Sequence, residues 1–322
     1  MASRSAAAAA PAPAARPVSG IRQVASDYLE LTKPKVQSLL IFTTVTTMYV
    51  AGDPSIGLVL LTCLGGYLSA GGAGAVNHWY DRDLDATMKR TADRPVPSGR
   101  VAPNAALIYG LVLAALAVVV LTVGVNPLAA ALSFSGFLGY VLVYTVWLKR
   151  TTPQNIVIGG AAGAVPPLVG WAATTGSLSW TALYLFAIVF YWTPPHFWAL
   201  SLLMKDEYAK AGVPMLPVVR GERETRKQIL MYSILLYAVT QLPFCAGGFG
   251  AIYLGASIVL GAVFVGGAVR LYRRGESGSG AHAIDDRAAL LSGDRRAALW
   301  LYLYSLAYLA LLFASMVADA RL

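Results

Sequence analysis

Lys and Arg residues are distributed very unevenly along this chain of 322 residues, and their distribution limits what the chain can fold into. The sequence contains nine apolar stretches, each close to the ~20 residues with which a helix crosses ~30 Å of hydrocarbon. They cover residues 35–52, 56–79, 104–124, 127–147, 154–174, 179–203, 228–246, 248–270 and 297–318. If each stretch crosses a membrane once, 24 of the 25 Lys and Arg residues lie on one side, and only Arg321 lies on the other. The sequence therefore predicts an all-α, polytopic membrane protein with nine transmembrane helices.

The same uneven distribution predicts an orientation. Loops that face the cytoplasm carry an excess of Lys and Arg, so we expect the N-terminus and the long basic loops on the cytoplasmic side. All acidic residues except Asp53 and Asp319 lie on that side as well. A net charge of +9 would suggest nucleic-acid binding in a soluble protein, but here the basic residues border apolar spans, where topology and anionic lipid explain them. We therefore expect membrane lipid, and no nucleic acid, as a partner.

Residues 1–25 differ in composition from the rest of the chain, so we expect a disordered Ala/Pro-rich cytoplasmic tail there and one membrane domain over residues 26–322. The tail lacks the apolar core of a secretory signal. It carries Arg4 and Arg16, as a mitochondrial targeting segment would, but its prolines oppose the amphipathic helix that such a segment needs. We accordingly expect the cell inner (plasma) membrane, with the mitochondrial inner membrane as the weaker alternative.

Polar residues are densest just after the second apolar stretch. If its helix continues past Tyr80, then Asn77, Asp81 and Asp85 recur every four residues and lie on one face. Two carboxylates and an amide oxygen suit Mg²⁺, which typically takes one or two protein carboxylates and completes its shell with water and substrate phosphate. Cations that could hold the remaining charge of a diphosphate follow directly, at Lys89, Arg90, Arg94 and Arg100.

Two other interpretations compete for this segment. A calcium loop would need Gly and Glu where the chain has Ala86 and Ala92, so that interpretation fails. A solvated loop with Asp–Arg pairs at its surface is the second alternative, and the spacing alone leaves it open. A packed site is favoured because the preceding stretch is rich in glycine, and small residues let membrane helices approach closely. These glycines are Gly65, Gly66, Gly71, Gly72 and Gly74.

Two further basic-side segments contain candidate residues. Lys149 and Arg150 follow the fourth apolar stretch, where they are either topology charges or phosphate ligands. The fifth stretch is interrupted by Pro166-Pro167. Asp206 and Glu207 form a second acidic pair on the same side as Asp81.

The sixth apolar stretch contains Pro194-Pro195 followed by His196. Two adjacent prolines remove two backbone donors, so we expect the helix to break or kink there. An ionisable residue inside a span is a functional candidate. The structural alternative is that His196 hydrogen-bonds a carbonyl that the prolines leave free.

These segments resemble the UbiA-type superfamily of intramembrane aromatic prenyltransferases over about residues 28–318, and more narrowly its heme O synthase branch. The spacing shared across the superfamily is Asn77-x-x-x-Asp81-x-x-x-Asp85. Other matching segments are Met88-x-Arg90-Thr91-x-x-Arg94-Pro95 with Gly99-Arg100, Leu148-Lys149-Arg150 followed by Asn155-Ile156-Val157-Ile158-Gly159-Gly160, Thr193-Pro194-Pro195-His196-Phe197-Trp198, and Tyr208-x-x-Ala211-Gly212-Val213-Pro214-Met215. The last three point to the heme branch.

The resemblance implies nine helices around a central cavity that opens to the cytoplasmic side and sideways to lipid. Farnesyl diphosphate would bind through Mg²⁺ at Asn77, Asp81 and Asp85. Its ionisation would leave an allylic cation, which a vinyl group of heme b attacks, and water addition would then give heme O. A contact with the heme A synthase that acts next is also implied. The residues that would hold the diphosphate are Lys89, Arg90, Arg94, Lys149 and Arg150.

One departure from the superfamily concerns its second aspartate motif, at the cytoplasmic end of the sixth helix. His196 aligns near the first aspartate of that motif, and Asp206 and Glu207 fall at its end. We therefore expect His196 to be a catalytic residue that serves the diphosphate, the heme or the water. Asp206 is the candidate for a further metal ligand, with Glu207 as its alternative, and the role of His78 stays open.

Two other functional classes remain at this stage. Helices broken by prolines around polar groups also occur in secondary transporters, but here the acids gather on one side and the far side offers no comparable polar site. A purely structural membrane subunit would not need Asn77, Asp81 and Asp85 in register.

Overall fold

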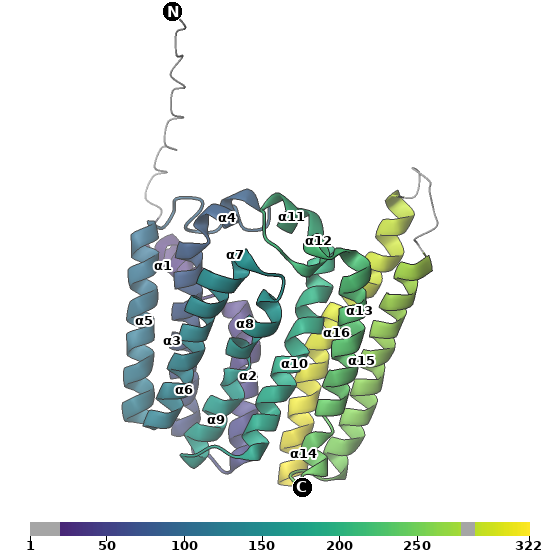
Figure 1. The fold of residues 1–322 in the computed structure, drawn as a ribbon. Helices are drawn as coiled ribbons and strands as arrows, with labels where there is room; N and C mark the ends of the chain where they lie inside the picture. The colour runs from purple at the N-terminus through teal and green to yellow at the C-terminus, as the bar shows by residue number, and fades with distance from the viewer. Residues whose placement is uncertain (1–19, 278–286) are drawn as a thin grey trace, which may run out of the picture.

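The computed structural model describes residues 20–277 and 287–322, and in these parts the chain is entirely helical (Figure 1). The expected tail lies mostly outside the described residues. Its last part, from Ile21, already belongs to the first helix. The elements in chain order are α1 (Ile21–Leu31), α2 (Pro34–Ala51), α3 (Ile56–Tyr80), α4 (Arg82–Thr87), α5 (Pro103–Gly124), α6 (Pro127–Leu138), the π-helix η1 (Gly139–Leu148), α7 (Lys149–Thr151), α8 (Asn155–Gly163), α9 (Val165–Thr175), α10 (Trp180–Leu203), α11 (Lys205–Lys210), α12 (Leu216–Val219), α13 (Gly221–Val239), α14 (Leu242–Cys245), α15 (Ala251–Ser277) and α16 (Arg287–Arg321).

The predicted apolar stretches all coincide with helices in the described parts of the chain, as single helices or as helices that follow one another in line. By length and composition, seven of these segments can cross a membrane, so the protein is a multi-pass membrane protein. They are Ile56–Tyr80, Pro103–Gly124, Pro127–Thr151, Asn155–Thr175, Gly221–Cys245, Ala251–Arg274 and Gly293–Arg321. Nine crossings remain a prediction, because α2 and α10 are not among the seven.

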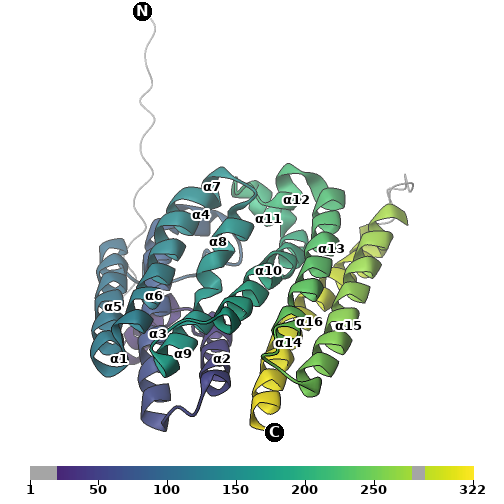
Figure 2. The same ribbon diagram turned by 60° about the horizontal axis from the view of Figure 1, so that its bottom comes forward.

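The two remaining helices pack against several neighbouring helices and carry polar side chains at these contacts. α10 packs between α8 on one side and α13 and α16 on the other (Figures 1 and 2), and α2 packs against α3, α9 and α16. Half of the 24 residues of α10 are buried. Side chains that face other helices are not selected for lipid, so α2 can bury Thr43, Thr44, Thr46 and Thr47, and α10 can bury His196.

The short connections begin their helices with capping residues. Ser55 accepts a hydrogen bond from the backbone of Leu58 at the start of α3, and Asn126 and Ser179 cap α6 and α10 in the same way. Such caps satisfy backbone N–H groups that have no partner inside the helix. These connections lie at one end of the bundle, and α4, α7, α11 and α12 lie at the other, which we call the basic end (Figure 1).

The two proline pairs behave differently. The fifth stretch divides into α8 and α9, with Pro166 and Pro167 in the first turn of α9, where proline costs no helical hydrogen bond. The expected break at Pro194-Pro195 is wrong, because α10 runs through both residues. Proline has a helix-compatible φ angle, and the packing of neighbouring helices can offset the missing donors inside a membrane protein.

Glycine allows α3 and α5 to approach very closely, as expected for the glycine-rich stretch. A Cβ atom added at Gly72 would lie 2.6 Å from the carbonyl oxygen of Gly110, and one added at Gly110 would lie 2.7 Å from that of Gly72. No real Cβ atom fits at such distances, so the two backbones are in direct contact. This contact fixes α3, and with it the polar segment that follows.

Candidate active site

Asn77, Asp81 and Asp85 lie on one helical face, as their spacing predicts. Asp81 joins α3 to α4, its N–H donates to the carbonyl of Asn77 at 2.9 Å, and the N–H of Asp85 donates to the carbonyl of Asp81 at 2.8 Å. The helical hydrogen-bond pattern therefore continues across the junction. All three side chains are buried, which excludes the solvated-loop interpretation for them.

Asn77, Asp81 and Asp85 form a row along this face, and the amide of Asn77 connects the row to neighbouring residues. Its Nδ2 donates to Asp81 Oδ2 at 2.6 Å and to Thr145 Oγ1 at 3.1 Å. Its Oδ1 accepts a hydrogen bond from Lys33 Nζ at 2.5 Å. Asn77 thus has a donor side turned to a carboxylate and an acceptor side turned to a cation.

Cations from two loops reach the aspartates. Arg94 Nη1 donates to Asp85 Oδ2 at 2.7 Å, and Lys149 Nζ donates to Asp81 Oδ2. Asp81 Oδ1 is buried and has no hydrogen-bond partner. The structure therefore brings Arg94 and Lys149, two of the predicted diphosphate ligands, to the carboxylates of the row.

Lys33 belongs to this cluster, although the sequence indicated only a topology charge. Its backbone has a φ angle of 54°, in the left-handed region that side chains other than glycine rarely adopt, and such strain is typical of functional sites. Burial, with Arg94 and Lys149 nearby, lowers the pKa of Lys33 to about 7, while Asp85 and Asp81 oppose that shift. The only signal in the sequence was a lysine directly before a proline at the start of a span.

Arg150 has a different set of contacts. It donates two hydrogen bonds of 2.7 Å to Asp83 and one of 3.0 Å to the carbonyl of Tyr80, and its nearest approach to Asp81 is 3.5 Å. The hydrogen bond from Arg150 lowers the pKa of Asp83 to about 2. Arg150 is thus held mainly beside the row.

The remaining predicted cations lie further out. Lys89 and Arg90 are exposed on the loop after α4. Arg90 is near enough to Tyr208 to oppose the rise in the pKa of that phenol, which burial causes. Arg100 is committed elsewhere, because it forms an ion pair of 2.9 Å with the buried Asp27 of α1. The structure therefore does not place Arg100 at the row.

A π-helix shapes the opposite wall of the site. η1 carries Tyr140, Tyr144 and Thr145, of which Thr145 accepts from Asn77 and Tyr140 accepts from Lys33 at 3.3 Å. π-helical turns are rare and are frequently found at functional sites. The apolar pattern of this stretch gave no sign of one, because the pattern reports which residues are apolar and not how the backbone is wound.

The donor set of the row fits Mg²⁺. Two buried carboxylates and one amide oxygen match the hard-oxygen preference of this ion, and Asp81 Oδ1 is a buried acceptor without a hydrogen bond. Within residues 20–277 and 287–322, no group of three or more His, Cys, Asp or Glu side chains is arranged to hold a metal. A metal at the row would therefore draw its remaining ligands from water and substrate.

The second acidic pair is not part of this cluster. Asp206 is exposed on α11, whereas Glu207 has a buried Oε2 atom with no hydrogen-bond partner. α11 and the loop after it do pack on the loop of the row, through Tyr208, Val213 and Met88. Of the two acids, Glu207 is the one with a buried carboxylate oxygen, and a metal-ligand role for either acid stays a prediction.

His196 lies in a separate environment, between α10 and α16. Its ring stacks on Trp192 and Tyr302, at centroid distances of 4.3 and 4.8 Å, and its Nδ1 is 2.6 Å from Ser305 Oγ. The partner of this histidine is a hydroxyl group, not a carbonyl that the prolines free. Ser305 Oγ also lies 2.6 Å from the carbonyl oxygen of Tyr302.

Two tautomers of His196 are compatible with these contacts. If the Ser305 hydroxyl donates to the carbonyl of Tyr302, Nδ1 of His196 donates to Ser305 and Nε2 keeps a lone pair. If the hydroxyl donates to Nδ1 instead, Nε2 carries the proton.

His78, next to Asn77 on α3, is also buried. It is only 1% exposed, and neither ring nitrogen has a hydrogen-bond partner. An interfacial histidine would be partly hydrated, so the structure favours a packed position next to the row.

Comparison with known proteins agrees with this geometry. The UbiA prenyltransferase family matches residues 39–292. A protoheme IX farnesyltransferase of Chloroflexus aurantiacus is 54% identical over 92% of this chain, which spans 48% of that relative, about half its length. One of Symbiobacterium thermophilum is 50% identical, over 92% of this chain and 95% of the relative.

A solved structure supports the fold. A UbiA homolog from Archaeoglobus fulgidus, bound to DMAPP and Mg²⁺, superposes with a TM-score of 0.60 at 16% identity, over 88% of this chain and 99% of the homolog. Together with the buried Asn77–Asp81–Asp85 row, these similarities show that the chain belongs to the UbiA prenyltransferase family, in its protoheme IX farnesyltransferase branch.

Proposed function

We propose that this protein transfers the farnesyl group of farnesyl diphosphate to a vinyl group of heme b, with addition of water, to give heme O and diphosphate. The observation that carries the proposal is the buried row of Asn77, Asp81 and Asp85 with Lys33, Arg94 and Lys149 around it. The names of the relatives support farnesyl and heme as the two substrates.

The row would bind the diphosphate end of the substrate. Mg²⁺ held by Asn77, Asp81 and Asp85 would supply the positive charge that stabilises a departing diphosphate. The A. fulgidus homolog, bound to DMAPP and Mg²⁺, supports this assignment. Lys149 and Arg94 now contact the carboxylates, and both can turn to phosphate oxygens when a diphosphate enters.

The cluster around the row also favours ionisation. The C1–O bond of farnesyl diphosphate breaks with its electron pair on oxygen, so negative charge grows on the diphosphate. Once Lys33, Arg94 and Lys149 hold the bound diphosphate, they stabilise the charge that grows on it during ionisation. Lys89, Arg90 and Arg150 lie further out and would steer the anion to the site or close over it.

The second half of the reaction involves heme b and water. A vinyl carbon attacks C1 of the farnesyl cation, and the new cation beside the porphyrin ring takes up water, which then loses a proton. In the tautomer that keeps a lone pair on Nε2, His196 suits that proton, or the heme itself. Glu207, in place of the exposed Asp206, would complete a second metal position if one forms.

The orientation also belongs to this proposal. The basic end would face the cytoplasm in the cell inner (plasma) membrane, where the soluble diphosphate product is released. Heme O would stay in the membrane and pass to a heme A synthase, the partner that the family resemblance implies.

A direct assay tests the proposal. Membranes or purified protein are incubated with heme b, farnesyl diphosphate and Mg²⁺, and the hemes are analysed by mass spectrometry. We expect a heme heavier by one farnesyl group and one hydroxyl, formed only when all three are present. A protein that binds both substrates and forms no such heme would contradict the assignment.

A further inference from the structure

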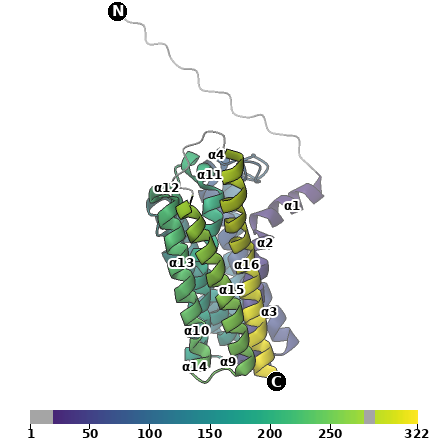
Figure 3. The ribbon, with the colours of Figure 1, turned by 90° about the vertical axis from the view of Figure 1, so that its right-hand side faces the viewer.

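Three arginines surround a cavity at the basic end of α15 and α16, outside the site described above. The cavity has a volume of about 380 Å³ and is lined by Arg270, Arg274, Arg296 and Trp300, with Gly267, Gly293 and Ala297. α15 and α16 form the side of the bundle away from α4 and α7 (Figures 1 and 3). The proposed prenyl-transfer chemistry does not use these residues.

Among residues 20–274 and 293–322, whose side chains the structure describes, no ion pair involves Arg270, Arg274 or Arg296. The acid of α16 closest to them in sequence, Asp294, is bonded instead to Arg226 of α13 at 3.0 Å. Three guanidinium groups around one cavity therefore favour an anionic ligand.

Glycine contacts hold the walls of the cavity in place. A Cβ at Gly267 would lie 2.2 Å from the Trp300 ring, so the indole packs directly on the backbone of α15. A Cβ at Gly293 would lie 2.8 Å from Nη1 of Arg274, so that side chain crosses closely over α16. Trp300 also stacks on Tyr304, with ring centroids 4.9 Å apart. These contacts place the indole of Trp300 against the backbone of α15 and the end of Arg274 against α16.

An exposed apolar surface continues from the cavity toward the middle of the membrane-spanning helices. On α15, Val263 and Val259 precede Gly267 at intervals of four residues, and they are 42% and 62% exposed. On α16, Leu299 and Leu303 follow Arg296 at helical spacing and are 44% and 53% exposed. The order of these features matches that of a phospholipid. The arginines would face its phosphate, Trp300 its glycerol region and the apolar surface its acyl chains.

We propose that this cavity is a binding site for the headgroup of an anionic phospholipid. The phosphate lies among Arg270, Arg274 and Arg296, the glycerol region lies beside Trp300, and the acyl chains follow the apolar surface between α15 and α16. A soluble phosphate would use the arginines and leave the tryptophan and the apolar surface without a function.

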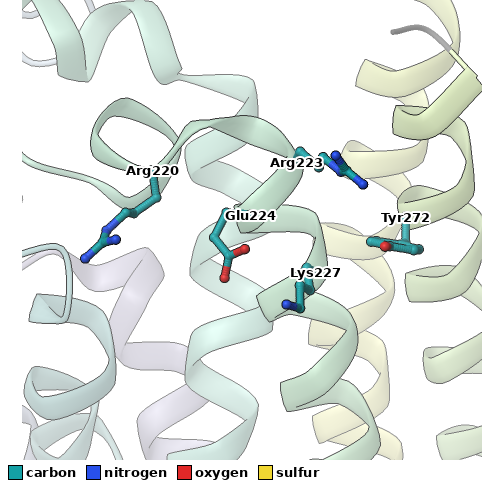
Figure 4. A pocket seen from close by; sticks show the side chains of 5 residues that line it. All are labelled: Arg220, Arg223, Glu224, Lys227 and Tyr272. Carbon is teal, nitrogen blue, oxygen red and sulfur yellow. The ribbon is translucent and has the colours of Figure 1, made fainter.

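The neighbouring cavity at the basic end provides a contrast. It has a volume of about 350 Å³ and is lined by Arg220, Arg223, Glu224, Lys227 and Tyr272 (Figure 4). Glu224 points into it between the basic residues and would repel a phosphate. We therefore assign the lipid to the cavity between α15 and α16.

Lipid binding can be measured on the purified full-length protein by native mass spectrometry. Phosphatidylglycerol and phosphatidylcholine with the same acyl chains are titrated separately. A basic residue at a membrane surface contributes enough attraction to change affinity about fivefold. We expect Arg270→Gln, Arg274→Gln and Arg296→Gln each to weaken phosphatidylglycerol binding by about that factor, and the triple variant by about 100-fold.

Arg295→Gln is the matched control, because Arg295 is exposed on α16 next to Arg296 and does not line the cavity. It should bind phosphatidylglycerol as the unchanged protein does. The single variants keep the test valid if the triple variant does not fold. Equal binding by the Arg296→Gln and Arg295→Gln variants would overturn the proposal, and so would equal binding of the two lipids.

A competition experiment distinguishes the lipid from a free anion. Inorganic phosphate and chloride are added at matched ionic strength to the protein with bound phosphatidylglycerol. We expect the same small loss from both salts, since each only screens the charges. Displacement by phosphate alone would show a site for a soluble anion and would refute the lipid assignment.

Discussion

Asp81 and Asp85 accept hydrogen bonds from Lys149 and Arg94 in a buried setting, and such pairs are costly to maintain. Removing two charges from water costs several kcal/mol per ion, which their attraction repays only with good geometry and further hydrogen bonds. A salt bridge at the protein surface avoids most of this desolvation cost, because its charges stay in contact with water. The cost is understandable if these groups are arranged for a substrate, so the first predictions concern them.

Asp81→Asn and Asp85→Asn should each lower heme O formation by ~10²-fold or more, because each removes a charge that would anchor Mg²⁺ and diphosphate. Asp83→Asn is the matched control: Asp83 lies on α4 with Asp85, is exposed and pairs with Arg150. Turnover is measured over a range of Mg²⁺ concentrations on equal amounts of inserted protein. Activity within a few-fold of the unchanged protein for both variants would exclude the role.

Arg94→Lys should raise the KM for farnesyl diphosphate, since a guanidinium can hold two phosphate oxygens at once and an ammonium group cannot. Lys89→Gln removes a cation from the same loop, but Lys89 is exposed, so we expect a smaller effect. Initial rates at varied farnesyl diphosphate distinguish the two variants. An unchanged KM for Arg94→Lys would leave Arg94 as a partner of Asp85 alone.

His196→Ala should keep affinity for farnesyl diphosphate and lose heme O formation, if Nε2 serves the heme or the water. Ser305→Ala should lower heme O formation less strongly, because it removes the hydrogen-bond partner of Nδ1. Without that partner, the position of the proton on the imidazole ring is no longer fixed. Binding and turnover are measured on one quantified preparation. A joint fall in both would assign His196 to the diphosphate, and a lower protein level with normal specific activity would make it structural.

The row of Asn77, Asp81 and Asp85 could be predicted at this scale because helical periodicity is local information. Lys33 could not, since its contact with Asn77 joins residues 44 positions apart. Nor could the sequence separate Arg94 from Arg100, two arginines of one loop. Only the fold decides that one meets Asp85 and the other meets Asp27.

Helices could be predicted where the length of an apolar stretch determines them. They were harder to predict where the backbone hydrogen-bond pattern departs from that of a regular α-helix. The bounds of α3 and α5 agree with the apolar stretches to within a residue or so. The π-helix η1 and the unbroken α10 were not foreseen. Both depend on how neighbouring helices satisfy or tolerate irregular backbone hydrogen bonds, and a single segment does not contain that information.

Gly72→Ala should destabilise the protein by about 1–3 kcal/mol, because its methyl group would collide with the backbone of α5, which cannot move aside. Gly66→Ala on the same helix is the control. Its Cβ would lie 3.8 Å from Ile41, an ordinary contact, and alanine favours a helix by about 1 kcal/mol over glycine. Thermal unfolding in detergent compares the two. Equal melting temperatures would show that α3 and α5 are not in backbone contact.

At the scale of the whole molecule, the charge distribution predicts which end faces the cytoplasm. A reporter fused near Thr175 or Gly248 should be extracytoplasmic, and one near Arg94 or Arg223 should be cytoplasmic. The structure places the first pair at the end opposite α4 and the second pair at the basic end. Labelling of residues 82–100 from outside the cell would reverse the orientation, and with it the proposed route of the diphosphate.

The bundle as a whole could be predicted in outline, because apolar length and the positions of Lys and Arg constrain every span. Which helices lie inside could not be predicted in the same way. α2 and α10 were predicted as spans like the others, and that prediction stays untested; their buried threonines and histidine lie where these helices pack against other helices. The contacts of His196 with α16 join positions more than 100 residues apart, which no pattern along the chain contains.

The cations beside Asp81 and Asp85 also affect how the protein can be made. A ribosome-bound chain enters the membrane before any cofactor or substrate is at hand, and two bare carboxylates among apolar helices would oppose its insertion. Lys149 and Arg94 come from the chain itself and neutralise both. On the proposed function, the chain would then insert without a metal ion, and Mg²⁺ would be needed for the reaction and not for assembly.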